Sequence, residues 1–211
     1  MFRRKTACPA LRPAGRGRAR LHIRLPTRLT AKLLAVLAFA FLAQAGAAQA
    51  AVGWSPIFDY AQSGDTGAVD YLLKKGESID AVNSGGETIL TIAAANGHLD
   101  LVELAIASGA RIDHENGFGK TALCWAAERG HRAAAERLLQ HKADVNHQTR
   151  DGMTPLMLAV RAGRAPIVQL LLRHKADMSL QDYTGKGVLD WAREGRDRRI
   201  EEMLRRAGAG G

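Results

Sequence analysis

Short apolar segments follow one another along the chain in an order that predicts pairs of helices. The segment TPLMLAVRAG at 154–163 ends in a glycine, and a second apolar segment, IVQLLL, follows at 167–172. Apolar residues spaced three and four apart indicate amphipathic helices, and Ala and Leu, which dominate these segments, are strong helix formers. The pattern therefore predicts an all-α fold in which two short helices alternate with turns.

The same pattern recurs every 33 residues along the chain. A Thr opens the first helix of each pair, and a Gly follows it nine residues later. These positions are Thr88, Thr121 and Thr154, and Gly64, Gly97, Gly130 and Gly163, with Ser55 and Gly187 in the Thr position of the first and last copies. A single unit of this size has no partner for its apolar face, whereas stacked units bury a continuous core. The spacing therefore predicts five stacked copies.

These units resemble the ankyrin repeat, in which Thr-Pro-Leu opens one helix, Gly-His follows it, and Val-x-x-Leu-Leu leads to a Gly-Ala turn. The corresponding turns read SGARID at 108–113, HKADVN at 141–146 and HKADMS at 174–179. The resemblance implies an ankyrin-repeat solenoid of about five 33-residue helix-turn-helix units with connecting hairpin loops. We place the repeat domain at 51–208, with units at about 54–83, 84–116, 117–150, 151–183 and 184–208, and a flexible tail at 209–211.

The repeat explains individual residues and also departs from the family pattern. The Thr hydroxyls are expected to cap free backbone N–H groups, Pro155 to occupy a first helical turn, and the glycines to end first helices in left-handed turns. The family's His after Thr-Pro-Leu is absent; its positions hold Phe58, Thr91, Cys124, Met157 and Asp190. The first and last units are irregular and are interpreted as capping repeats.

The basic residues of the chain are concentrated near its beginning. Residues 1–50 contain ten of the 30 Lys and Arg residues and no acidic residue, which leaves 20 basic against 21 acidic residues in the remainder. The overall charge of +9 therefore belongs to the leader. Since the repeat domain has no basic excess, the composition argues against nucleic acid as a partner.

The leader has the three parts of a secretory signal peptide. An Arg-rich segment precedes the apolar run LLAVLAFAFLA at 33–43, and small residues follow, ending in Ala48-Gln49-Ala50. The apolar run is short for a bilayer span. We expect a bacterial Sec-type signal peptide over 1–50, cleaved near Ala50, and a periplasmic or secreted mature protein that does not contact the membrane. The alternative is an uncleaved signal that anchors an adaptor.

No arrangement of residues indicates catalysis or a cofactor. Cys124 is the only Cys after the leader and is expected to be a buried, inert thiol. His98 and His131 are one repeat apart, as are His141 and His174, but a metal site would need further converging ligands. We therefore expect no enzyme activity, metal or cofactor. An enzyme or metal-binding protein on the same scaffold is the less favoured alternative.

The resemblance implies that a partner protein binds the hairpin tips and the exposed face of the first helices. By repeat position, that surface comprises Glu87, Asn96, Phe118, Lys120, Glu128, Arg129, Arg150, Met153, Arg161, Tyr183, Lys186 and Glu194. Large apolar and Arg side chains dominate binding hot spots, so Phe118, Met153 and Tyr183 are expected to anchor the partner.

Arg129 and Arg161 are expected to be exposed beside these anchors, which would suit a partner with an acidic, partly apolar patch. Trp125 and Trp191 are interpreted as core residues. The sequence thus predicts a monomeric, non-catalytic protein-binding module, and it leaves the partner's identity open.

Overall fold

The computed structural model describes residues 55–195 and 197–208, so the predicted signal peptide and the tail at 209–211 lie outside the described residues. This part of the chain forms ten α-helices and no extended strand, with one isolated bridge between Gln181 and Gly187. The helices are α2 (Ile57–Ser63), α3 (Thr66–Lys74), α4 (Ile89–Asn96), α5 (Leu99–Ala107), α6 (Ala122–Arg129), α7 (Arg132–Gln140), α8 (Pro155–Arg161), α9 (Ala165–Arg173), α10 (Val188–Glu194) and α11 (Arg198–Arg206).

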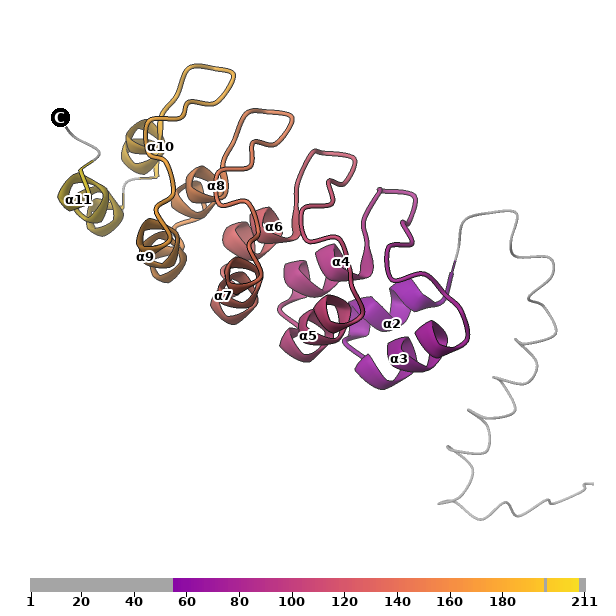
Figure 1. Ribbon diagram of the computed structural model, residues 1–211. Coiled ribbons are helices and arrows are strands. Elements are labelled where there is room, and N and C mark those ends of the chain that lie inside the picture. The colour runs from indigo at the N-terminus through magenta and orange to yellow at the C-terminus, as the bar shows by residue number, and fades with distance from the viewer. Residues whose placement is uncertain (1–54, 196, 209–211) are drawn as a thin grey trace, which may run out of the picture. The chain divides into compact units, whose positions relative to one another are not determined.

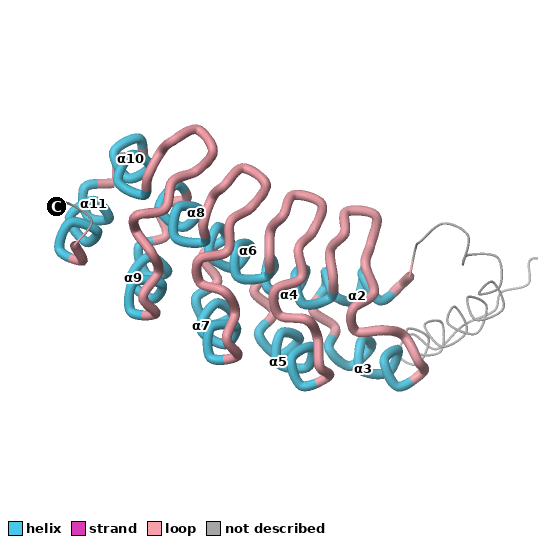
Figure 2. The backbone as a smooth tube through the Cα atoms, turned by 45° about the horizontal axis from the view of Figure 1, so that its top comes forward, coloured by secondary structure: helices cyan, strands magenta, loops and turns pink. Residues whose placement is uncertain are grey.

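The helices form five antiparallel pairs that stack side by side (Figure 1). The first helices of the pairs, α2, α4, α6, α8 and α10, make an inner row, and the second helices make an outer row. Long loops, which we call the hairpins, project from one side of the stack between successive pairs (Figure 2). This arrangement confirms the predicted all-α solenoid.

The helix ends follow the predicted capping chemistry. The side-chain oxygens of Thr88, Thr121 and Thr154 accept hydrogen bonds from backbone N–H groups of the first turns of α4, α6 and α8. Pro155 occupies the first turn of α8, where its missing N–H costs nothing. The glycines that follow the first four inner helices have positive φ, for example 76° at Gly97, which ends each helix in the left-handed region.

The core is continuous from the first pair to the last. The three central inner helices, α4, α6 and α8, have most of their residues buried, because each lies between two inner helices and also contacts its own outer helix. Small residues such as Ala93 and Ala126, both fully buried, allow this close approach. Outer helices bury one face only, with Leu138 and Leu171 at 0% exposure. The two rows therefore differ in how much of each helix is buried.

Adjacent units are also joined by polar contacts that recur from one repeat to the next. His98 Nε2 lies 3.0 Å from the carbonyl oxygen of Gln62, and His131 Nε2 lies 3.1 Å from that of Ala95. Arg164 takes the next position in this series and donates to the carbonyl oxygen of Glu128. The regular spacing of His98 and His131 thus reflects structural contacts between units.

Candidate protein-binding surface

The residues predicted to bind a partner occupy three levels of the hairpin side. The hairpin tips carry Phe118, Arg150 and Tyr183. The hairpin bases carry Glu87, Lys120, Met153 and Lys186. The inner helices carry Asn96, Glu128, Arg129, Arg161 and Glu194. The four base residues take the same position in successive repeats, and each directly precedes the residue that caps an inner helix. The repeat therefore brings the predicted residues onto one continuous side of the stack.

Phe118 and Tyr183 are exposed at the tips. The two residues are 66% and 74% exposed, although neighbouring hairpins contact each other through backbone hydrogen bonds. The amide N–H of Arg150 donates to the Phe118 carbonyl, and that of Tyr183 donates to the Asp151 carbonyl. Because the backbone holds the tips together, these aromatic rings are presented on a fixed framework and are not required for the core.

The expectation that Met153 is an exposed anchor is wrong. The residue is only 3% exposed, and its sulfur lies 3.1 Å from Nη1 of Arg161. The side chain turns inward because its position at the hairpin base is covered by the longer Arg161 side chain from α8. Met153 therefore belongs to the core and presents no apolar group to a partner.

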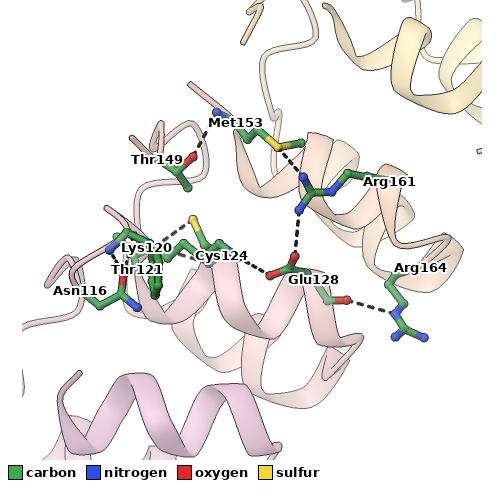
Figure 3. Close-up of polar contacts among 10 residues, drawn as sticks. Asn116, Lys120, Thr121, Cys124, Glu128, Thr149, Met153, Arg161 and Arg164 are labelled. Atoms are coloured by element: carbon green, nitrogen blue, oxygen red, sulfur yellow. Dashed lines mark hydrogen bonds and ion pairs between the residues drawn. The ribbon is translucent and has the colours of Figure 1, made fainter. Parts of the chain in front are cut away.

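Arg161 is part of an internal ion-pair network and is not an isolated cation (Figure 3). Its Nη2 lies 2.9 Å from Glu128, whose other carboxylate oxygen lies 2.5 Å from Nζ of Lys120. Burial alone would raise the pKa of Glu128, but the hydrogen bonds and charges of Lys120 and Arg161 outweigh it and lower that pKa. Of the two cations predicted to face a partner, only Arg129 forms no ion pair within the described residues.

A related pair lies two units further on. Nζ of Lys186 is 2.6 Å from Glu194, and this contact raises the pKa of Lys186. Like Lys120 and Glu128, these residues bridge a hairpin base and the end of the inner helix. Five of the predicted partner-binding residues therefore form ion pairs with one another on this surface: Lys120, Glu128, Arg161, Lys186 and Glu194.

Trp125 and Trp191 are more than core residues. Both side chains are partly exposed, and cations lie over their rings. Nζ of Lys120 is 4.3 Å from the ring centre of Trp125, and the guanidinium of Arg129 is 5.7 Å from it. Nζ of Lys186 and the guanidinium of Arg161 lie 4.7 Å and 5.7 Å from the ring centre of Trp191. The assignment to the core is therefore incomplete, because part of each indole belongs to the surface.

Trp125 also lines a depression of about 310 Å³ on the inner row. Its lining comes from α2, α4, α6 and one hairpin base: Gln62, Glu87, Ile92, Ala95, Asn96, Trp125 and Arg129. Three of these residues, Glu87, Asn96 and Arg129, were predicted from the sequence. Trp125 and Gln62 were missed, because the hydrophobic pattern assigned Trp125 to the core and Gln62 has no unusual feature of its own.

The two indoles differ in their hydrogen bonds. Trp191 Nε1 donates to Asp182 Oδ2 at 3.0 Å. Asn116 takes the place of Asp182 two repeats earlier, and its Oδ1 accepts from the backbone N–H groups of Phe118 and Lys120. The side-chain nitrogen of Asn116, Nδ2, is a hydrogen-bond donor. Both this atom and the other donor, Trp125 Nε1, are buried and have no hydrogen-bond partner in the described part of the chain. The carboxylate oxygen of Asp182, which accepts a hydrogen bond from Trp191, is thus replaced in the unit of Trp125 by the Asn116 side-chain nitrogen, which can only donate.

We expect Asp182→Asn to lower the free energy of unfolding by about 1–2 kcal/mol at neutral pH, because it leaves the Trp191 N–H unpaired. Asn116→Asp, the reverse change, should raise it by about 1 kcal/mol. Burial would raise the pKa of Asp182, but hydrogen bonds from Thr184, the Lys186 backbone and Trp191 prevail and lower it.

The stabilisation by Asp182 is therefore present above the ordinary Asp pKa and is lost as the pH falls through the lowered folded-state value. Urea unfolding of wild type and Asp182→Asn at neutral and acidic pH checks both points. A difference that is absent at neutral pH, or that grows in acid, would contradict this role of Asp182.

The structure confirms the predicted burial of Cys124. Cys124 is fully buried, and burial raises the pKa of its thiol, which keeps it protonated and weakly reactive. No group of three or more His, Cys, Asp or Glu side chains is arranged to hold a metal ion in this part of the chain. The surface instead presents exposed aromatic rings, paired charges and a depression beside Trp125.

Comparison with known protein families is decisive for the fold. A family model described as ankyrin repeats (3 copies) matches residues 90–182, and one described as ankyrin repeats (many copies) matches residues 57–106. Together they span more than half of the chain. The chain belongs to the ankyrin repeat family. Ankyrin repeats generally mediate binding to other proteins, and ankyrin repeat domains are typically non-catalytic scaffolds. No curated protein matches the chain significantly.

The matched residues contain the helices from α2 to α9. The last pair, α10 and α11, lies beyond them and continues the same stack of ankyrin repeats. Within the described ankyrin domain, no helix is both long enough and apolar enough to cross a bilayer.

Proposed function

We propose that this protein is an exported, monomeric and non-catalytic binding module that docks one folded partner protein through its hairpin tips and inner helices. The observation that carries the proposal is the exposure of Phe118 and Tyr183 at the tips. Aromatic side chains are costly to leave in water and are enriched in binding hot spots, and the stacked hairpins hold these two without using them for the core.

The rest of the surface is held in place by contacts within this protein. The tips are joined by backbone hydrogen bonds, and the charges of Lys120, Glu128 and Arg161 hold one another in place. A surface that is already ordered loses little conformational entropy when it binds. The depression beside Trp125 adds a concave feature that a partner side chain can enter.

We expect Phe118→Ala/Tyr183→Ala to weaken partner binding by about 2 kcal/mol or more, since it removes both exposed anchors. The free energy of unfolding should change by no more than about 0.5 kcal/mol. The measurement is capture of the partner from the periplasmic fraction on immobilised wild-type protein, followed by titration of the purified partner with the variant.

Tyr71→Ala is the matched control, because Tyr71 is a 48% exposed aromatic on α3 in the outer row. It should leave partner binding unchanged. Loss of binding in Tyr71→Ala together with normal binding of the double variant would show that the partner docks on the outer row. Unfolding of the double variant would show instead that the tip aromatics are structural.

The proposal that the protein is exported rests on the sequence of the leader. Its basic segment, apolar run at 33–43 and small residues before Ala51 are those of a cleaved signal peptide. We expect the mature protein in the cell envelope to begin at Ala51, as N-terminal sequencing would detect. A purified chain that still carries residues 33–43 would contradict cleavage and favour a membrane anchor.

A further inference from the structure

The depression beside Trp125 has an equivalent site beside Trp191, two repeats further along the chain. In that second site an Arg side chain fills the space. There the Arg161 guanidinium lies 5.7 Å from the ring centre of Trp191 and makes two further contacts, with Glu128 and with the sulfur of Met153. Figure 3 shows Arg161 between Glu128 and Met153. We call this arrangement the filled cradle.

Each group of the filled cradle has an equivalent in the depression. The residues that stand two repeats before Glu128, Met153, Arg161 and Trp191 are Gln62, Glu87, Ala95 and Trp125, and all four line the depression. The residue that differs most is Ala95, which stands where Arg161 fills the other cradle. The depression thus exists because a methyl group replaces a long cationic side chain, while polar groups and an indole still surround the space.

The surrounding groups are suited to a cation. Glu87 supplies a carboxylate that forms no ion pair in the described residues and accepts only a neutral hydrogen bond from the Asn83 side-chain amide. Gln62 supplies a side-chain carbonyl. The face of an indole ring attracts guanidinium and ammonium groups electrostatically. Compared with the filled cradle, the carboxylate has moved: Glu87 takes the position of Met153, and the neutral Gln62 takes that of Glu128.

Arg129 is the one cation in the lining, and it lies at the end of α6. The filled cradle already holds two cations over one indole, since Nζ of Lys186 lies 4.7 Å from the Trp191 ring centre beside Arg161. Two cations lie over Trp125 as well, Lys120 Nζ at 4.3 Å and the Arg129 guanidinium at 5.7 Å from its ring centre. Glu128 neutralises Lys120, so an incoming guanidinium would adjoin Arg129 and would take Glu87 as its counter-charge.

We propose that the depression binds an exposed Arg side chain of the partner protein, which places its guanidinium over Trp125 and pairs it with Glu87. The planar guanidinium can stack on the indole and bond the carboxylate at the same time, which an ammonium group does less well. This inference rests on the proposed protein-binding function and specifies one element of the partner's chemistry. It differs from the sequence-based expectation of an acidic, partly apolar patch on the partner, which stays a prediction.

The test uses the mature chain and three short blocked peptides, Gly-Arg-Gly, Gly-citrulline-Gly and Gly-Glu-Gly. Citrulline has the shape of Arg without its charge. The readout is the NMR resonance of each indole N–H. We expect the Arg peptide to shift the Trp125 resonance and to leave that of Trp191 in place. The other two peptides should leave both resonances unchanged.

Four variants make the test specific. Ala95→Arg should fill the depression from within and abolish the response, while Ala95→Gln, which is shorter and uncharged, should only weaken it. Glu87→Gln should weaken peptide binding by about tenfold, the effect of losing one partly desolvated charge pair. Arg161→Ala should empty the filled cradle, so that the Trp191 resonance also responds to the Arg peptide.

A response to the citrulline or Glu peptide equal to that of the Arg peptide would overturn the proposal, as would a full response in Ala95→Arg. Partner capture separates this inference from the proposed function. If wild type and Ala95→Arg capture the partner equally well, the Arg site is wrong and the binding function stands. If Ala95→Arg loses the partner while remaining folded, the Arg site is supported.

Discussion

Leu171→Ala is expected to lower the free energy of unfolding by about 2–5 kcal/mol, the range for truncating a buried Leu. Leu171 is 0% exposed on α9, which packs against α8 and against the outer helices on either side. The loss combines the transfer energy of the removed atoms with the cost of the cavity. Leu138, the equivalent and also fully buried residue of α7, should behave in the same way when truncated. Urea unfolding followed by circular dichroism measures both.

Leu172→Ala is the matched control, since the neighbouring Leu172 is only partly buried. It should cost clearly less than Leu171→Ala. Equal losses at the two positions would mean that α9 is rotated relative to the described packing. Wild-type stability of both Leu138→Ala and Leu171→Ala would mean that the repeat register of the core is wrong.

Gly119→Ala is expected to lower the free energy of unfolding by about 3 kcal/mol, because two costs act together. Gly119 has a φ of +70°, where a residue with a Cβ atom is strained by about 1–3 kcal/mol. An added methyl group would also lie 2.8 Å from the backbone nitrogen of Arg150 in the next hairpin. Overpacking of this kind costs about 1–3 kcal/mol when the neighbour is backbone and cannot turn away.

Gly185→Ala isolates the first of these costs. Gly185 occupies the same hairpin position two units later with a φ of +82°, and an added methyl group there meets no atom within 4 Å. It should therefore lose only about 1 kcal/mol. If thermal or urea unfolding showed the same loss for both variants, the contact between neighbouring hairpins would contribute nothing to stability.

The repeat architecture was predictable because its causes lie close together in the sequence. Helix starts such as Thr121 depend on a hydroxyl and a backbone N–H three residues apart, and helix ends such as Gly130 depend on the φ of one residue. Core positions follow from the periodic spacing of apolar residues within one unit. Each cause recurs once per repeat, so agreement among the copies makes the prediction secure.

The surface was less predictable because its causes lie in neighbouring units. Phe118 and Tyr183 were expected at exposed tips and are found there, since a tip has few neighbours. Met153 was expected to be exposed as well, but the longer Arg161 side chain covers it. Whether a base residue faces solvent depends on the length and charge of a side chain on an adjacent helix, which the repeat pattern does not reveal.

The amino-acid sequence by itself determined the fold class, the number of stacked helix pairs, the helix caps and the exposed tips, because local backbone preferences and apolar periodicity decide these features. The tertiary structure alone decided which charges are paired, as in the Lys120–Glu128–Arg161 network, and where the depression beside Trp125 lies. Those features arise from side chains of adjacent units that compete for the same space. Ala95 leaves the space open only because Gln62, Glu87 and Trp125 surround it in the folded stack.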